Sequence, residues 1–154
     1  MKYISTLLAV TDMEKSKQFY RDVLGLSVAA DFGANVTLEG GVVLQTIDTW
    51  KSFIRTDTVF LPHHAGELYF EEEDMDAFCR HLKSLPIDYV HELFEHRWGQ
   101  RVVRFYDPDK HIIEVGETLK TVVLRFQSQG LSPEETALRM DVPLDFVTAC
   151  LDKE

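Results

Sequence analysis

Apolar and polar residues alternate along this chain with either the two-residue period of a strand or the 3.6-residue period of a helix. The order in which these two patterns occur repeats once. Residues 4–10 form an apolar run typical of a strand, and residues 13–24 carry apolar side chains at helical spacing. Three further runs, at 26–32, 36–38 and 42–47, alternate as strands do and are separated by glycine-containing turns. The pattern therefore predicts the order β-α-β-β-β in the first part of the chain.

The same order begins again after Gly66. Asp74 precedes the second predicted helix as Asp12 precedes the first, and a carboxylate at that position caps backbone N–H groups. The strands of this second copy are predicted at 67–72, 89–94, 101–106 and 112–115. The two copies share almost no residue identity, so the repeat is one of pattern. It predicts two modules, 1–50 and 66–117, within one domain at 1–117.

The segments outside the two copies differ in kind. Residues 51–65 show no clear period and predict a connector or a lid, with one short strand at 58–60. Residues 118–154 predict a helical extension that includes Ser132-Pro133-Glu134-Glu135, the sequence of a capped helix start. The extension also resembles a helix-turn-helix core, but its last helix has no Arg or Lys before Lys153. We therefore expect the extension to serve packing or dimerisation and not nucleic-acid binding.

Composition narrows the class of protein and its partners. With 154 residues, 45% hydrophobic and 27% charged, the chain is typical of a soluble globular protein. No apolar window is long enough to span a membrane, and a net charge of −10 opposes nucleic acid and anionic lipid. Cys79 and Cys150 do not form a disulfide framework, and the N-terminus lacks a signal-peptide pattern. We expect a cytoplasmic location.

The stretch from Arg101 to Val115 holds most of the candidate chemistry. Asp107-Pro108 suits the first two positions of a β-turn. Positive φ is uncommon for a residue other than glycine, so with Lys110 we expect this turn to be either slightly different or mildly strained. His111 is expected on the surface. Glu114 lies in an apolar strand, where a carboxylate must be solvated, paired or bound to a metal.

Two stretches, Leu8 to Leu26 and Trp98 to Glu114, resemble the vicinal oxygen chelate superfamily. This superfamily includes glyoxalase I, bleomycin- and fosfomycin-resistance proteins and extradiol dioxygenases. The resemblance covers residues 3–117. It implies an α+β fold in which two βαβββ modules form curved mixed sheets around a cleft, here followed by the small C-terminal helical appendage.

The resemblance also implies a metal site built from the first and last strands of each module. The matching positions are Ser5, Gln45, Glu67 and Glu114, each expected in a strand. Gln45, Glu67 and Glu114 are the predicted metal ligands, and Glu67 and Glu114 the predicted catalytic residues. Ser5 is a poor ligand, and Glu67 replaces the usual His. Three side chains that offer oxygen and no imidazole suit Mg²⁺, Mn²⁺ or Ca²⁺ better than Zn²⁺. Ni²⁺ and Zn²⁺ are nevertheless candidates to be tested beside Mg²⁺ and Mn²⁺.

A second interpretation dispenses with the metal. Glu67 and Glu114 would then be solvated or paired with Arg101 or Arg104 in a ligand pocket. The residues predicted to line a substrate pocket are Ser5, Tyr69, Trp98, Arg101 and Phe105, with Trp50 a further aromatic candidate. His63 and His64 are expected to be solvated loop residues.

Two functions remain open on the sequence alone. The first is a glyoxalase-like lyase or isomerase that uses a divalent cation, and the second is a metal-free protein that sequesters a small molecule. Both predict a small-molecule partner and a homodimer, and neither calls for a cofactor other than the metal.

Overall fold

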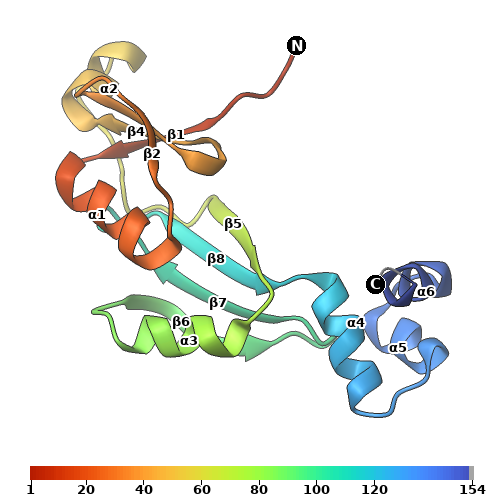
Figure 1. Ribbon diagram of the computed structural model, residues 1–154. Coiled ribbons are helices and arrows are strands. Elements are labelled where there is room, and N and C mark those ends of the chain that lie inside the picture. The colour runs from red at the N-terminus through yellow and green to blue at the C-terminus, as the bar shows by residue number, and fades with distance from the viewer. Residues whose placement is uncertain (153–154) are drawn as a thin grey trace. The chain divides into compact units, whose positions relative to one another are not determined.

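The computed structural model describes residues 1–152, and its backbone divides into two compact units (Figure 1). Unit 1 comprises residues 1–68, 85–88 and 106–112, and unit 2 comprises residues 69–84, 89–105 and 113 onward. Each unit is built around one four-stranded sheet. The units are not continuous in sequence, because the Asp-Pro turn near residue 107 groups with unit 1.

The first sheet has the strand order β1-β4-β3-β2. Its strands are β1 (Thr6–Val10), β2 (Val28–Asp31), β3 (Asn35–Leu38) and β4 (Val42–Thr46). β1 pairs with β4 in parallel, and the other pairs are antiparallel. A short 3₁₀ turn, η1 (Glu39–Gly41), joins β3 to β4. The strands confirm the sequence prediction for the first copy.

Helix α1 (Met13–Leu24) begins and ends where the sequence predicts. The Asp12 carboxylate accepts a hydrogen bond from the Lys15 N–H at 3.0 Å, and Gly25 ends the helix at φ 68°. The helix buries Tyr20 and Val23, the apolar positions that set its helical period.

The segment after β4 differs from the prediction. Residues predicted to continue the strand and begin a connector form helix α2 (Ile47–Ile54), and no strand forms at 58–60. Thr49 Oγ1 donates to the Thr46 carbonyl at 2.9 Å in the first turn, and Arg55 ends the helix at φ 55°. The helix was missed because Ile47 continues the strand pattern of β4 and because Arg55, not a glycine, ends the helix.

The second sheet has the strand order β5-β8-β7-β6 and confirms the second copy. Its strands are β5 (Glu67–Glu72), β6 (Asp88–Glu95), β7 (Arg101–Tyr106) and β8 (Ile112–Glu117). Helix α3 (Met75–Lys83), capped by Asp74 as predicted, packs on one face of this sheet. Met75 and Leu82 are fully buried there, and the centres of the Phe78 and Phe105 rings lie 6.4 Å apart.

The C-terminal extension folds into helices α4 (Leu119–Ser128), α5 (Pro133–Met140) and α6 (Leu144–Leu151). Ser132 and Glu135 form the predicted capping box, with bonds of 3.2 and 2.8 Å. The three helices share one apolar cluster, made of Val122, Val123, Phe126, Ala137, Met140 and Val147. This confirms the packing role expected of the extension.

The Asp-Pro turn is the polar centre of unit 1. Asp107 Oδ1 accepts from the backbone N–H groups of Asp109 and His111, both at 2.9 Å. Its Oδ2 accepts from the Tyr20 hydroxyl at 2.9 Å, and Thr11 Oγ1 donates to Asp109 at 2.6 Å. The turn therefore holds α1 and the end of β1 within the unit.

Two predictions about this turn have different outcomes. Lys110 has φ 72°, which confirms the strained position. The surface position of His111 is wrong, because His111 is 8% exposed and its Nδ1 donates to Asp107 Oδ2 at 2.8 Å. Strand alternation pointed the ring outward, but the turn's own carboxylate binds it instead.

Residues 1–152 contain no helix with the length and apolar character required to cross a bilayer.

Candidate functional site

The second sheet presents two chemically different faces. Arg101 and Phe105 contact α3, through Asp76 at 2.9 Å and through the Phe78 ring. Since side chains alternate along a strand, Arg104 projects from the opposite face of β7. We call this opposite face, which carries Tyr69, Arg104 and Glu114, the Glu114 face, and the other the α3 face.

Glu114 is paired with an arginine on its own face. The Arg104 Nη2 contacts Glu114 Oε2, and the two side chains are 24% and 8% exposed. The predicted metal-free interpretation named Arg101 or Arg104 as the partner of this carboxylate, and the structure pairs it with Arg104. The arginine is always protonated, so Glu114 has a permanent positive charge beside it.

His91, from β6, joins this pair. Arg104 Nη1 lies 3.2 Å from His91 Nε2, and His91 Nδ1 lies 2.8 Å from the Glu92 carbonyl. A guanidinium only donates and a carbonyl only accepts, so the hydrogen of this imidazole is on Nδ1. His91 therefore accepts from Arg104 and helps to orient the cation beside Glu114.

Tyr69 lies on the same face, above a glycine of β8. A Cβ on Gly116 would come within 3.3 Å of the Tyr69 ring, so the absent side chain leaves room for the ring. Gln100 Nε2 donates to the Tyr69 hydroxyl at 3.1 Å, and that hydroxyl donates to Glu71 at 3.3 Å. Burial raises the pKa of Tyr69 and Glu71 adds to the rise, so the hydroxyl stays protonated at neutral pH.

Two residues predicted for the substrate pocket lie on the α3 face instead. Phe105 is fully buried in the core, and Arg101 holds Glu117 through its Nη2 at 2.7 Å and its Nε at 2.8 Å. The structure therefore does not bring Arg101 and Phe105 together with Tyr69 and Glu114.

Glu117 is a fully buried carboxylate with two arginine partners. Besides Arg101, it binds Arg125 Nη2 at 3.0 Å and the Arg101 backbone N–H at 3.0 Å. Burial raises the pKa of Glu117, but the hydrogen bonds from Arg101 and Arg125 outweigh it and leave the pKa below its usual range. These bonds link β7, β8 and α4 in unit 2.

The remaining predicted ligands belong to unit 1. Ser5 lies just before β1, so the prediction that it is in a strand is wrong. Gln45, in β4, is buried, and its amide accepts from Asn35 Nδ2 at 2.7 Å and donates to the Ala34 carbonyl at 2.8 Å and to Thr49 Oγ1. Glu67 is exposed at the first position of β5.

These donors do not fit a divalent cation as they stand. The Gln45 amide has hydrogen-bond partners on both its oxygen and its nitrogen, and the Glu114 carboxylate already faces a full positive charge. Within residues 1–152, no three His, Cys, Asp or Glu side chains gather as a metal would require. The metal site stays a prediction.

The other predicted aromatic and histidine residues are spread over both units. Trp50 lies on α2 and Trp98 in the connection between β6 and β7. His63 and His64 are exposed in a loop, as predicted, and His64 Nε2 lies 2.8 Å from the Tyr106 hydroxyl.

Sequence reasoning missed His91 and Gln100, both partners of predicted residues. His91 reaches Arg104 across the β6–β7 pair, and Gln100 reaches Tyr69 from the start of β7. The pairing register of the sheet is the signal that would have found them, and the spacing of residues along one strand does not contain it.

A family model described as a glyoxalase-like domain matches residues 3–120 of this chain. The match ends at the start of α4, so α5 and α6 lie outside it.

Three similar proteins illustrate the relationship. The crystal structure of a protein of unknown function from Agrobacterium tumefaciens is similar to this fold, with a TM-score of 0.71 and 39% sequence identity. The match covers 77% of this chain and 94% of that chain. Lactoylglutathione lyase from the same organism is 26% identical, with a TM-score of 0.58, over 77% of this chain and 94% of that chain. The uncharacterized protein YraH of Bacillus subtilis (strain 168) is 27% identical in an alignment of 128 residues. The match covers 77% of this chain and all of that protein.

Proposed function

This chain belongs to the glyoxalase-like family of the vicinal oxygen chelate superfamily, and on that premise we propose that it binds a small anionic molecule on the Glu114 face without a metal ion. The observation that supports this proposal is the pairing of Glu114 with Arg104. The resemblance implies a cation beside the glutamate of the last strand, and here a guanidinium supplies the positive charge.

The chemistry of a guanidinium defines the class of ligand. Its planar set of N–H donors matches a carboxylate, or two neighbouring oxygen atoms, better than a single oxygen. Arg104 is oriented by His91 and Glu114 and keeps part of its side chain exposed. Tyr69, half exposed on the same face, adds a hydroxyl and an aromatic ring. A small carboxylate, or a molecule with adjacent oxygen atoms, is therefore the expected ligand.

The proposal is tested by melting the protein in the presence of EDTA with oxalate, lactate or lactoylglutathione. A ligand that binds only the folded state raises the melting temperature. We expect at least one of the three to do so, and Arg104→Gln to abolish the effect. Arg80→Gln is the matched control, because Arg80 is exposed on α3, which covers the opposite face.

Two results would contradict the proposal. One is that no anion stabilises the protein while EDTA is present. The other is that Arg104→Gln responds as the unaltered protein does.

The predicted lyase is the second candidate, favoured by the 26% identity to lactoylglutathione lyase. In that case Glu67 and Glu114 would be the catalytic carboxylates, and Gln45 would join them around Mg²⁺, Mn²⁺, Ni²⁺ or Zn²⁺. The ultraviolet absorbance of the lactoylglutathione thioester measures turnover with each metal in turn. Turnover that Glu67→Gln removes would favour the lyase, whereas no turnover with any of the four metals would exclude this reaction.

We propose that the protein is a homodimer and that it is located in the cytoplasm. β1 is an edge strand of the first sheet, and the residues leading into it expose Tyr3 and Ile4. An exposed apolar edge invites pairing with another chain. Light scattering on the purified protein distinguishes a dimer from a monomer, and a monomeric mass would overturn this part of the proposal.

A further inference from the structure

A cavity in unit 2 lies where the helical extension meets the connection between β6 and β7. Its volume is about 970 Å³, the size of a pocket for a small organic molecule. The residues that line it are Arg97, Trp98, Gln100, Leu119, Leu138, Arg139, Met140, Asp141 and Val142. Residues 138–142 lie outside the part of the chain that matches the glyoxalase-like model, so one wall is supplied by the extension.

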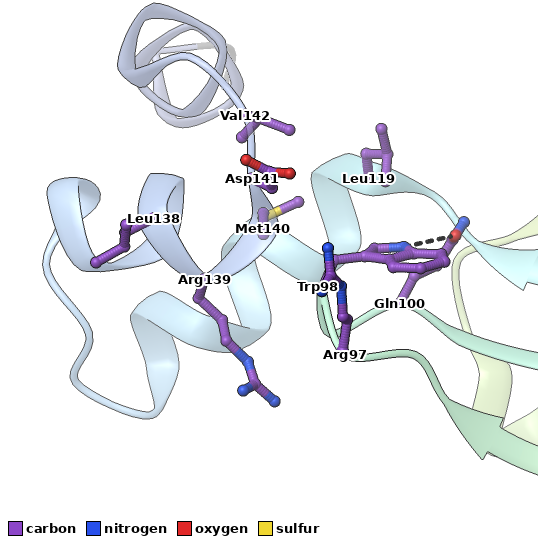
Figure 2. A pocket seen from close by; sticks show the side chains of 9 residues that line it. All are labelled: Arg97, Trp98, Gln100, Leu119, Leu138, Arg139, Met140, Asp141 and Val142. Carbon is purple, nitrogen blue, oxygen red and sulfur yellow. Dashed lines mark hydrogen bonds between the residues drawn. The ribbon is translucent and has the colours of Figure 1, made fainter.

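Apolar and charged side chains line both sides of the cavity. Figure 2 shows Met140, Asp141 and Val142 across from Trp98 and Leu119, with Arg97 beside Trp98. Trp98, Leu119 and Val142 are partly exposed, so these apolar surfaces are available to a ligand. An aromatic ring is the group that would fill this space with the largest gain in buried apolar area.

The Trp98 ring is held in place. Its Nε1 donates to Gln100 Oε1 at 3.3 Å, a bond drawn in Figure 2. The imidazole of His96 stacks on it with ring centres 4.1 Å apart and planes 10° from parallel. A ring fixed on one side and open to a cavity on the other loses little freedom when a ligand stacks on it.

The charged side chains that line the cavity are Arg97, Arg139 and Asp141. Arg97 and Asp141 are both exposed, and neither has an ion-pair partner within the part of the chain that the structure describes. Arg139 also lines the cavity, and it pairs with Glu95 at 3.7 Å. Asp141 has φ 58° because it is the left-handed residue that ends α5, a position that Asp tolerates.

From this arrangement we infer that the cavity binds an aromatic amino acid. The carboxylate of the ligand would meet Arg97, its ammonium would meet Asp141, and its ring would lie against Trp98 and Leu119. A purely anionic ligand would be repelled by Asp141, and a purely cationic one by Arg97. The site is distinct from Arg104 and Glu114, so it does not depend on the proposed function.

Fluorescence of Trp98 tests the inference directly. The chain has two tryptophans, so Trp50→Phe, in unit 1, leaves Trp98 as the only one. Titration of this variant with L-phenylalanine should change the emission in a saturable way. If the variant does not fold, the indole N–H signal of Trp98 in the nuclear magnetic resonance spectrum of the unaltered chain gives the same readout.

Two variants and two ligand analogues test whether Arg97 binds the carboxylate of the ligand and Asp141 its ammonium group. Arg97→Gln and Asp141→Asn should each weaken binding about tenfold, the typical effect of one lost charge-assisted hydrogen bond. Asn tolerates the positive φ of Asp141, so that substitution removes the charge and keeps the backbone. Phenylpropionate lacks the amine and phenethylamine lacks the carboxylate, so each should also bind about tenfold more weakly. Arg80→Gln, on α3, should bind as before.

The possible results of these titrations either support the proposed site or overturn it. A saturable response that both variants weaken and Arg80→Gln does not would support the site. No saturable response to L-phenylalanine, or equal binding of the two analogues and the amino acid, would overturn it.

Discussion

Glu114 and Glu117 lie on the same strand, β8, and both are buried, yet their surroundings differ. Glu117, on the α3 face, receives hydrogen bonds from Arg101, from Arg125 and from a backbone N–H. Glu114, on the opposite face, pairs with Arg104, which His91 orients. A carboxylate whose oxygens are all occupied by the fold serves stability. A carboxylate with one arginine partner, on a face not covered by α3, has the arrangement of a binding group.

The largest effect is expected from exchanging these two carboxylates for amides. Glu117→Gln leaves two arginines near a neutral side chain and should destabilise the protein by about 2–4 kcal/mol, less than a fully buried pair because both arginines reach solvent. Glu114→Gln, the matched variant, loses one arginine partner instead of two and should cost less, about 1–2 kcal/mol. Urea denaturation measures both. A greater loss for Glu114→Gln would reverse the roles given to the two faces.

The pH dependence of stability sharpens the same comparison. The pKa of Glu117 lies below its ordinary value of 4.5 in the folded protein, because its arginines outweigh the effect of burial. The unfolded chain therefore binds a proton at higher pH than the folded one. The contribution of Glu117 is fully present above pH 4.5 and is lost as the pH falls through the folded pKa.

The free energy of unfolding, followed from neutral pH to below 4.5, should thus fall more steeply for the unaltered protein than for Glu117→Gln. Subtracting the variant removes the contributions of the other carboxylates. Parallel curves for the two proteins would show that Glu117 does not contribute in this way.

The smallest effect concerns the charge of Arg104. Burial lowers the pKa of His96 below its ordinary value of 6.5, and the charge of Arg104 lowers it further. Arg104→Gln should raise the pKa of His96, and Arg80→Gln should leave it unchanged. A proton magnetic resonance titration of the His96 ring measures both. An unchanged pKa in Arg104→Gln would mean that this guanidinium does not influence the Glu114 face.

The sequence predicts most of the regular structure because the strand and helix periods are clear and Asp12, Asp74 and Ser132 cap their helices. Helix α2 escaped prediction because Ile47 continues the strand pattern of β4 and because Arg55, not a glycine, ends the helix. His111 escaped because a local hydrogen bond to Asp107 overrides the direction that alternation implies.

The candidate site was predictable only in part. Glu114 is conspicuous as a carboxylate in an apolar strand. The choice between Arg101 and Arg104 as its partner depends on how β7 pairs with β8, and the register of two strands is not contained in either strand's own pattern. The split of the predicted pocket residues between two faces has the same cause.

The central claim is that the guanidinium of Arg104 supplies the positive charge that a metal ion would otherwise bring to Glu114. Its most direct test is the metal content of protein purified without chelator, followed by titration with Mn²⁺, Ni²⁺ and Zn²⁺ while the melting temperature is monitored. The account predicts no stoichiometric metal and no stabilisation by any of the three ions. One equivalent of bound metal that Glu114→Ala abolishes would contradict it.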